Sequence, residues 1–455
     1  MNENFSLQKG GLVLVHFSVE NWMSFRDRID FTMVSTLERQ HRERLSILKK
    51  HGIKILPIVA IYGGNASGKT SFFKAFAFLR NLVINGAKLD IDAHIPIDPF
   101  LLDPESKGSA TVFSISILVK EQIYEFSFSA TKEKILEEKL SLVNKTSKKI
   151  LYHRKEGKPN FPTAPTSLFK TGINRMNFAF ENTRDNQLFL TNSIYQNIEE
   201  FRPVYNWFKE SLQLISFNSR SNLIEQLVET QDSCCLMNKW LSQLDTGISR
   251  LYFEKKHFGT PPKQLARFLG NSLRNSNEKQ SFFIIENGNL VTKKLVAAHK
   301  NINGEDVPMN MDQESDGTIR LMDLLPIFFE ISKHDSNKTF IIDEIDKHLH
   351  PILMKKLLEI YLYNYSGTKR SQLIFTTHNI FYMEQALLRR DEIWITERNS
   401  NNNISKLFSL SEFKDIRYDK DIKKSYLENR FGGIPNIPHD TCFDENENNK
   451  NQNIN

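Results

Sequence analysis

The sequence predicts an α/β fold in which a mixed sheet carries a phosphate loop, beside a layer of antiparallel strands and a helical insertion. Three observations lead to this prediction. An apolar segment at 53–62 runs into a glycine-rich loop and a helix, alternating strands fill 110–142, and helix and strand alternate from Gly317 onward. At 455 residues the chain is long enough for two lobes, or for one large domain with an insertion.

The first part of the chain has mainly strand patterns. Residues 13–25 and 26–34 alternate apolar and polar side chains, which predicts an antiparallel pair. Residues 53–62 are almost continuously apolar, as expected of a strand in the middle of a sheet, and residues 68–80 have helical spacing. Further strands are predicted at 110–119, 124–130, 135–143 and, as a hairpin with its turn at Glu156 and Gly157, at 148–161.

Helical patterns dominate the middle of the chain. Residues 203–214, with Pro203 at a first helical position, and residues 223–255 are predicted as helices without a sustained heptad, and thus as a compact lid. Residues 282–296 return to strand, and the polar, asparagine-rich 444–455 is expected to be disordered. These patterns divide the chain at 12–195 (first part of the α/β head), 196–280 (helical insertion or lid), 281–438 (second part of the head) and 439–455 (disordered tail).

Composition narrows the class of protein. No apolar run approaches the length of a membrane span, and the N-terminus lacks the basic-then-apolar order of a signal peptide, so we expect a cytoplasmic protein without membrane partners. Cys234, Cys235 and Cys442 form neither a disulfide framework nor a zinc motif. The net charge of +6 is compatible with nucleic acid as a partner without requiring it.

The glycine-rich loop is the strongest motif. "GGNASGKT" fits G-x-x-x-x-G-K-[ST] between a strand and a helix. Its backbone N–H groups and the helix N-terminus favour phosphate, Lys69 reaches the β and γ oxygens, and Thr70 is a magnesium ligand. The predicted nucleotide-binding residues here are Gly63, Gly64, Asn65, Ala66, Ser67, Gly68, Lys69, Thr70 and Ser71.

Two further strands end in chemically active side chains. "KTFIIDEID" delivers Asp343 and Glu344 to the carboxyl edge of the sheet, where Asp343 is expected to hold magnesium and Glu344 to activate the attacking water. "QLIFTTHNI" delivers His378 to the same edge, where it is placed to contact a γ-phosphate. We therefore predict Glu344, His378 and Lys69 as catalytic residues.

A small polar loop precedes an amphipathic helix at "ESDGTIRLMDLL". By itself, Ser315 is a helix cap; beside the other motifs, Ser315 and Gly317 are expected to form a second phosphate-binding helix start. The pair His348 and His350 has a chelating spacing, but Pro351 and the lack of other nearby ligands favour a structural loop.

The order of these motifs resembles the ABC-type ATPase head shared by SMC, RecF and the overcoming-lysogenization-defect nucleases. That resemblance implies ATP and Mg²⁺ as cofactors and a homodimer or higher homo-oligomer, with Ser315 and Gly317 acting on ATP held by the partner subunit. It also implies that Asp346, Leu349 and His350 form a loop crossing the interface. The family has a glutamine after the phosphate loop that responds to the state of the nucleotide, and no glutamine of this sequence can be assigned to that role. "ESDGT" also departs from the usual leucine-serine-glycine-glycine form.

One branch is more similar still. "FSVENWMSFRDRIDFTM", "PFLLDPESKGSATVFSISI", "ESDGTIRL" and the ending "RRDEIWITERN" to "GGIPNI" resemble the bacterial AAA-ATPase-like proteins of abortive-infection type. The likeness spans most of residues 12–438. It implies an anti-phage ATPase switch that controls a separately encoded nuclease or toxin in response to a phage-derived trigger.

Other functions stay open. A RecF-like DNA repair ATPase is the main alternative, although the lysines of "SKHDSNK" and "KKLVAAHK" are scattered. An intrinsic nuclease is disfavoured because no second set of acidic residues suited to two metals follows His378, and a transporter subunit is disfavoured by the resemblance. The C-terminal "YLENRFGGIP", with Tyr426, Arg430, Phe431 and Pro435, either pins the chain end to the sheet or docks a partner.

Overall fold

The computed structural model describes residues 11–155, 158–160, 172–216, 237–241, 244–257, 259, 281–286, 289–413 and 421–434. The predicted turn at Glu156 and Gly157, the three cysteines, Pro435 and the 439–455 tail lie outside these ranges. Among the described residues, no helix has the length and apolar character needed to cross a membrane.

A central sheet of six strands holds the phosphate loop. Its order is β11 (Leu212–Ile215), β16 (Thr339–Ile342), β17 (Gln372–Thr376), β5 (Ile58–Tyr62), β18 (Ile393–Arg398) and β19 (Ser405–Ser409). The first five strands are parallel, and β19 pairs antiparallel with β18. Every residue of β5, β16 and β17 is buried, which explains why their sequences are mainly apolar.

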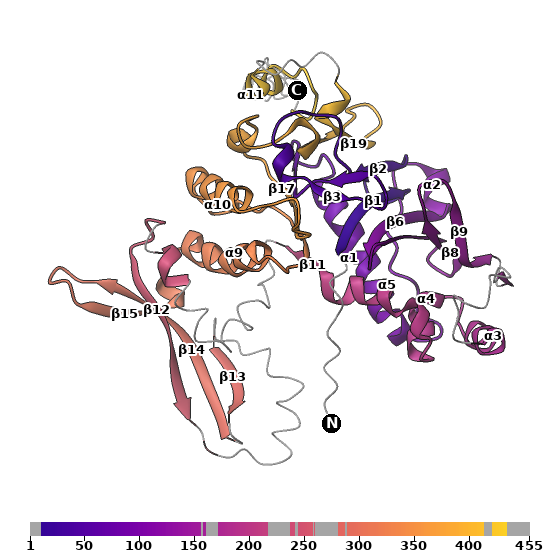
Figure 1. Cartoon of the computed structure of the whole chain (residues 1–455), viewed down its shortest axis with the longest axis horizontal. Coiled ribbons are helices and arrows are strands. Elements are labelled where there is room, and N and C mark those ends of the chain that lie inside the picture. Colours follow the sequence, from indigo (N-terminus) through magenta and orange to yellow (C-terminus); the bar gives the residue numbers. More distant parts are fainter. Residues whose placement is uncertain are drawn as a thin grey trace, which may run out of the picture.

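Helices and a second sheet cover the two faces of the central sheet. On one face, Val59 and Ile61 of β5 share a core with α1 (Lys69–Asn85) and the antiparallel layer. On the other face, Ile58 and Ala60 share a core with α9 (Asp316–Ser332) and α10 (Pro351–Tyr363). Figure 1 shows α9 and α10 on one side of the molecule and the antiparallel strands on the other.

The antiparallel layer has seven strands in the order β10-β9-β8-β7-β6-β1-β2. Their bounds are β1 Leu12–Glu20, β2 Ile29–Thr32, β6 Thr111–Val119, β7 Gln122–Ala130, β8 Ile135–Val143, β9 Lys148–Lys155 and β10 Lys158–Asn160. Stacked rings, such as Phe17 on Phe76 of α1 with centroids 3.9 Å apart, join the layer to the helix. The predicted α/β fold with a phosphate loop and an antiparallel layer is confirmed.

The predicted helix at 223–255 is wrong over its last part. Residues Ile248–His257 form β12, which belongs to a four-stranded antiparallel sheet with β13 (Ser281–Glu286), β14 (Asn289–Lys300) and β15 (Asp306–Asn310). This sheet projects beyond α9 in Figure 1. Tertiary pairing with β14 decides the structure, because "ISRLYF" combines β-favouring side chains with a long partner strand. β12 and β14 pair across the predicted domain boundary at 280.

The predicted helix at 203–214 also ends early. It consists of α5 (Arg202–Asn206) and one π-helical turn (Trp207–Ser211), after which β11 joins the edge of the central sheet. Four residues are too short for periodicity to separate a strand from a helix end. The remaining elements are β3 (Ser46–Leu48), β4 (Ile53–Ile55), α2 (Pro104–Gly108), α3 (Ile173–Glu181), α4 (Phe189–Tyr195) and α11 (Ile422–Leu427).

Candidate nucleotide site

The loop between β5 and α1 has a backbone that only glycine adopts without strain at two points. Gly63 and Gly68 have φ of 154° and 119°. A Cβ on Gly68 would lie 3.0 Å from the ring of Phe25, and one on Gly63 would collide with Thr396. Oγ of Ser67 lies 2.6 Å from Oγ1 of Thr396. Neighbouring strands therefore hold the loop in its curved form.

Lys69 begins α1 and turns back over the loop. Its Nζ donates to the carbonyl oxygens of Gly63 at 2.7 Å and Gly64 at 2.8 Å. Burial lowers the pKa of Lys69 to about 8, and the carboxylates of Asp343 and Glu344 oppose that shift. The ammonium thus loses its proton more easily than an ordinary lysine, and a phosphate placed beside it would favour the charged form.

Asp343 follows β16 and lies against the start of α1. Its Oδ2 accepts from Oγ1 of Thr70 at 3.2 Å, and its Oδ1 accepts from Oγ1 of Thr376 at 2.6 Å. Burial raises the pKa of Asp343, which the two hydroxyl hydrogen bonds oppose. A hydroxyl and a carboxylate side by side are hard oxygen ligands of the kind that Mg²⁺ prefers, so the residues present fit this ion.

Glu344 is held in an unusual backbone conformation. Its φ of 48° lies in the left-handed region, which a residue with a side chain adopts at an energetic cost. Its N–H donates to Oγ1 of Thr376 at 2.8 Å, and its carboxylate lies 3.6 Å from Nζ of Lys347. Thr376 therefore positions both acidic residues. In the sequence, the only sign of this role is that a threonine stands at the end of a buried strand.

One cavity, with a volume of about 870 Å³, collects most of the predicted residues. Glu344 and His378 line it together with residues 65–71 of the phosphate loop. Burial lowers the pKa of His378, and the nearby ammonium of Lys69 lowers it further. The cavity also has walls that the motifs did not predict: Met23, Ser24, Asp98, Pro99, Phe100, Leu101, Leu102, Arg398 and Asn403.

Ser315 and Gly317 do not line this cavity in their own chain. Oγ of Ser315 accepts from the N–H of Thr318 at 3.1 Å and caps α9. A Cβ on Gly317 would lie 2.7 Å from the carbonyl oxygen of His348, so the two loops are in close contact. One turn further, Nη2 of Arg320 donates to the carbonyl oxygen of Glu344 at 3.3 Å.

One residue of the His348 and His350 pair caps a helix. Nδ1 of His350 accepts from the N–H of Ile352 at 3.3 Å and caps α10. Within the described part of the chain, no group of three or more His, Cys, Asp or Glu side chains is arranged to hold a metal ion.

The C-terminal segment contacts the phosphate loop. The carbonyl oxygen of Gly433 accepts from the N–H of Gly64 at 2.8 Å and from the hydroxyl of Tyr426 at 3.0 Å. Phe431 is buried and packs on Phe413 with ring centroids 5.3 Å apart. These contacts favour the interpretation of this segment as a pin on the sheet.

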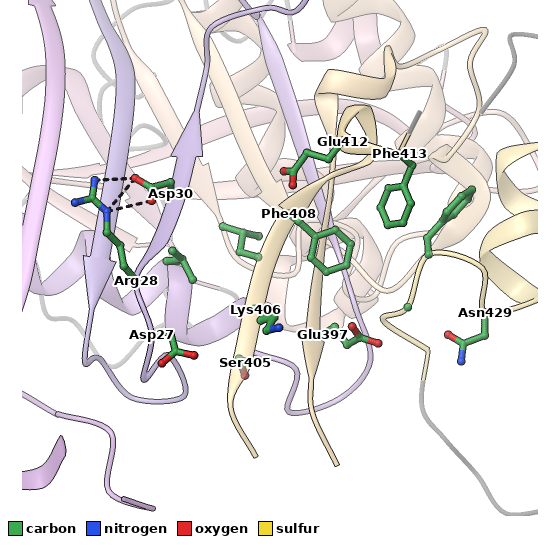
Figure 2. A pocket seen from close by; sticks show the side chains of 14 residues that line it. Asp27, Arg28, Asp30, Glu397, Ser405, Lys406, Phe408, Glu412, Phe413 and Asn429 are labelled. Carbon is green, nitrogen blue, oxygen red and sulfur yellow. Dashed lines mark hydrogen bonds and ion pairs between the residues drawn. The ribbon is translucent and has the colours of Figure 1, made fainter. Parts of the chain in front are cut away.

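A second cleft lies apart from the site. It has a volume of about 790 Å³ and runs between β2 and β19, where Figure 2 shows the hydrogen-bonded Arg28 and Asp30 on one wall and Phe408 and Phe413 on the other. None of the predicted nucleotide residues lines it. The cleft therefore does not belong to the phosphate site.

Known proteins were compared with the chain. The family model described as "AAA domain, putative AbiEii toxin, Type IV TA system" matches residues 58–384. A search of curated proteins found no match. Among solved structures, an SMC head domain from Thermotoga maritima is 13% identical, with 87% of this chain and 98% of that chain covered and a TM-score of 0.38.

Two further SMC heads are similar at the same level. One, bound to the C-winged helix domain of ScpA, is 13% identical over 87% of this chain and 97% of its own, with a TM-score of 0.36. The other, with an extended coiled coil and the C-terminal domain of ScpA derived from Pyrococcus furiosus, is 13% identical over 88% and 96%, with a TM-score of 0.34. These scores are low, so the assignment of the family rests on the matched family model.

Proposed function

The chain belongs to the AAA-domain family of the AbiEii-toxin type, and we propose that it binds ATP with Mg²⁺ and hydrolyses it slowly as a switch between two copies of itself. One observation supports the proposal more strongly than the others. Lys69 at the start of α1, Glu344 just after β16 and His378 just after β17 meet at one cavity. This arrangement supports a triphosphate site with a water-activating group beside it.

Binding is assigned to the loop and to α1. The backbone N–H groups of residues 65–71 and the N-terminus of the 17-residue helix α1 attract phosphate. When a nucleotide binds, Nζ of Lys69 gives up its hydrogen bonds to the carbonyl oxygens of Gly63 and Gly64 and donates to phosphate oxygens instead. Thr70 and Asp343 would hold Mg²⁺, which neutralises phosphate charge when it is bound.

Hydrolysis is assigned to the residues at the far end of the triphosphate. Glu344 orients the attacking water and accepts its proton, and the strained backbone at this position keeps the carboxylate on the cavity wall. His378 contacts the γ-phosphate from the end of β17. Nζ of Lys69, 3.5 Å from Nδ1 of His378, balances the charge that develops on the transferred phosphoryl group.

A second copy supplies the missing side of the site. Ser315 is exposed at the start of α9 and does not reach the cavity of its own chain, so its hydroxyl and the helix start are available to another subunit's triphosphate. ATP held between two copies binds only the closed state and therefore shifts the equilibrium toward it. Hydrolysis removes those contacts and reopens the dimer.

We assign the switch to anti-phage defence in the cytoplasm, where it restrains or releases a separately encoded toxin or nuclease after a phage-derived trigger. The family's description as a type IV toxin–antitoxin component supports this role. In cells that carry the gene with its neighbours, Lys69→Ala and Glu344→Gln are each expected to abolish phage protection. Full protection by both variants would refute the defence role.

The dimer is tested with purified protein. Glu344→Gln should bind ATP without turning it over and therefore accumulate as a dimer in sedimentation velocity with ATP and Mg²⁺. Adding Ser315→Arg should return that protein to a monomer, because the helix start no longer fits the partner's triphosphate. A Glu344→Gln protein that stays monomeric at saturating ATP would refute the dimeric switch.

A further inference from the structure

We propose that residues 98–102 form the subsite for the nucleoside part of the bound nucleotide, with Leu101 and Leu102 covering a face of the base. The inference rests on the proposed ATP binding and assigns a role to the "PFLLD" stretch, which the phosphate motifs leave unexplained. The subsite would select a nucleoside triphosphate over a bare polyphosphate.

The loop that carries the two leucines is firmly anchored. Oδ1 of Asn21 accepts from the N–H of Phe100 at 3.0 Å, while its Nδ2 donates to the carbonyl oxygens of Ser106 at 2.8 Å and Ser109 at 3.0 Å. The ring of Phe100 is 2% exposed. One buried asparagine thus ties together both ends of the loop, and the loop is preorganised to present what lies between them.

Leu101 and Leu102 are large apolar side chains that this anchored loop leaves exposed. They are 63% and 66% exposed, although they directly follow a buried phenylalanine and line the same cavity as the phosphate loop. Exposed leucine side chains cost free energy that an apolar ligand surface would recover. Nucleotide bases have such a surface on each face of the ring.

The direction of the bound triphosphate leads to this loop. Glu344 and His378 mark the γ-phosphate end and Lys69 the β- and γ-phosphates, so the α-phosphate falls toward Ser71, further along α1. Oγ of Ser71 accepts from Oγ of Ser24 at 3.0 Å.

Met23, the residue before Ser24, is hydrogen-bonded to the loop of residues 98–102. The N–H of Met23 donates to the carbonyl oxygen of Asp98 at 2.7 Å. The nucleoside attached to the α-phosphate therefore meets Met23 and then Leu101 and Leu102. A cavity of about 870 Å³ has the size of a complete small-ligand site.

The test compares ATP with inorganic tripolyphosphate, each with Mg²⁺, by calorimetric titration. The wild type should bind ATP more tightly than tripolyphosphate. The double variant Leu101→Ser/Leu102→Ser should lose about tenfold in ATP affinity, while its affinity for tripolyphosphate stays the same. Leu37→Ser, a 92% exposed leucine that does not line the cavity, is the matched control and should change neither.

Further variants make the result decisive. Leu101→Met/Leu102→Met keeps the apolar area and should keep ATP affinity. Unchanged ATP affinity in the serine variant, or an equal loss for both ligands, would overturn the inference. Normal ATP affinity in the serine variant together with loss of its ATP-dependent dimer would also overturn the inference, because the leucines would then contact a second subunit. Lys69→Ala tests the proposed ATP site separately from the nucleoside subsite. If this variant binds ATP and tripolyphosphate as the wild type does, the proposed ATP site itself fails.

Discussion

Nζ of Lys69 lies 3.5 Å from Nδ1 of His378, so two nitrogen bases from opposite ends of the chain meet over the phosphate loop. Burial lowers the pKa of each, and the ammonium further lowers the pKa of the imidazole. The free site therefore disfavours positive charge. A triphosphate opposes this preference at Lys69, because its negative charge favours the ammonium.

The first prediction concerns the pH dependence of ATP binding. The pKa of Lys69 is about 8 in the free protein and rises when a triphosphate binds. Below pH 8 the lysine is already charged and affinity is at its plateau. Above pH 8 binding requires a proton, and affinity falls by up to about tenfold per pH unit.

Calorimetry at pH 9, in buffers with different ionisation enthalpies, should show close to one proton taken up per ATP. His378→Gln should retain this uptake, because the imidazole pKa lies below its ordinary value of 6.5. No uptake at pH 9 would contradict the prediction.

The second prediction concerns the catalytic carboxylate. Glu344→Gln should reduce phosphate release by about 100- to 10,000-fold, because the amide cannot accept a proton from water. Nucleotide affinity, measured with a fluorescent ATP analogue, should change little. Glu359→Gln removes a half-buried carboxylate on α10 that lies 3.8 Å from Nζ of Lys356 and does not line the cavity, and it should hydrolyse ATP at the wild-type rate.

The third prediction concerns the contact between the two loops at Gly317. Gly317→Ala places a Cβ 2.7 Å from the backbone carbonyl of His348, so one of the loops must move. We expect hydrolysis to fall by about 10- to 100-fold, with ATP affinity of the monomer retained. Gly108→Ala, where a Cβ meets nothing within 4 Å, should leave the rate unchanged. Wild-type turnover in Gly317→Ala would show that this contact has no part in the cycle.

The fourth prediction concerns the C-terminal pin. Gly433→Ala adds a methyl group against Ile395 at φ of 79°, and it should displace the carbonyl that binds Gly64. We expect the free energy of unfolding in urea to fall by about 1–3 kcal/mol. Gly304→Ala carries the same left-handed backbone, φ 81°, in open space and isolates the cost of φ alone. Equal losses in the two variants would exclude a packing role for Gly433.

Much of the site could be predicted because a few backbone rules determine it. The spacing of Gly63, Gly68 and Lys69 specifies a phosphate loop, and apolar strands that end in Asp343, Glu344 and His378 place those residues at one edge of a parallel sheet. The remaining cavity wall was not predictable from the motifs. Leu101 and Arg398 reach the cavity only through tertiary packing, and their neighbours in sequence indicate no ligand.

The errors in the fold have the same physical origin. β12 and β11 are strands because of their partners, β14 and β16, which follow later in the chain. The local sequence indicates whether a segment is buried more reliably than it indicates which strand the segment pairs with. Where burial and periodicity agree, as in α9, the prediction is confirmed. The single strand predicted at 53–62 is wrong in its first part, because Ile53–Ile55 form β4, which pairs with β3, and only Ile58–Tyr62 form β5 of the central sheet.

The position of β5 has a consequence for biosynthesis. Its two hydrogen-bonding neighbours, β17 and β18, occupy residues 372–376 and 393–398, more than 300 residues after it. A ribosome that adds about 5–20 residues per second needs roughly 15–60 s to make that stretch. During this interval the nascent chain displays an apolar strand with two unpaired edges and no working nucleotide pocket. The proposed nucleotide site of newly made protein is thus complete only once these late strands emerge, and chaperones have that window in which to protect the chain.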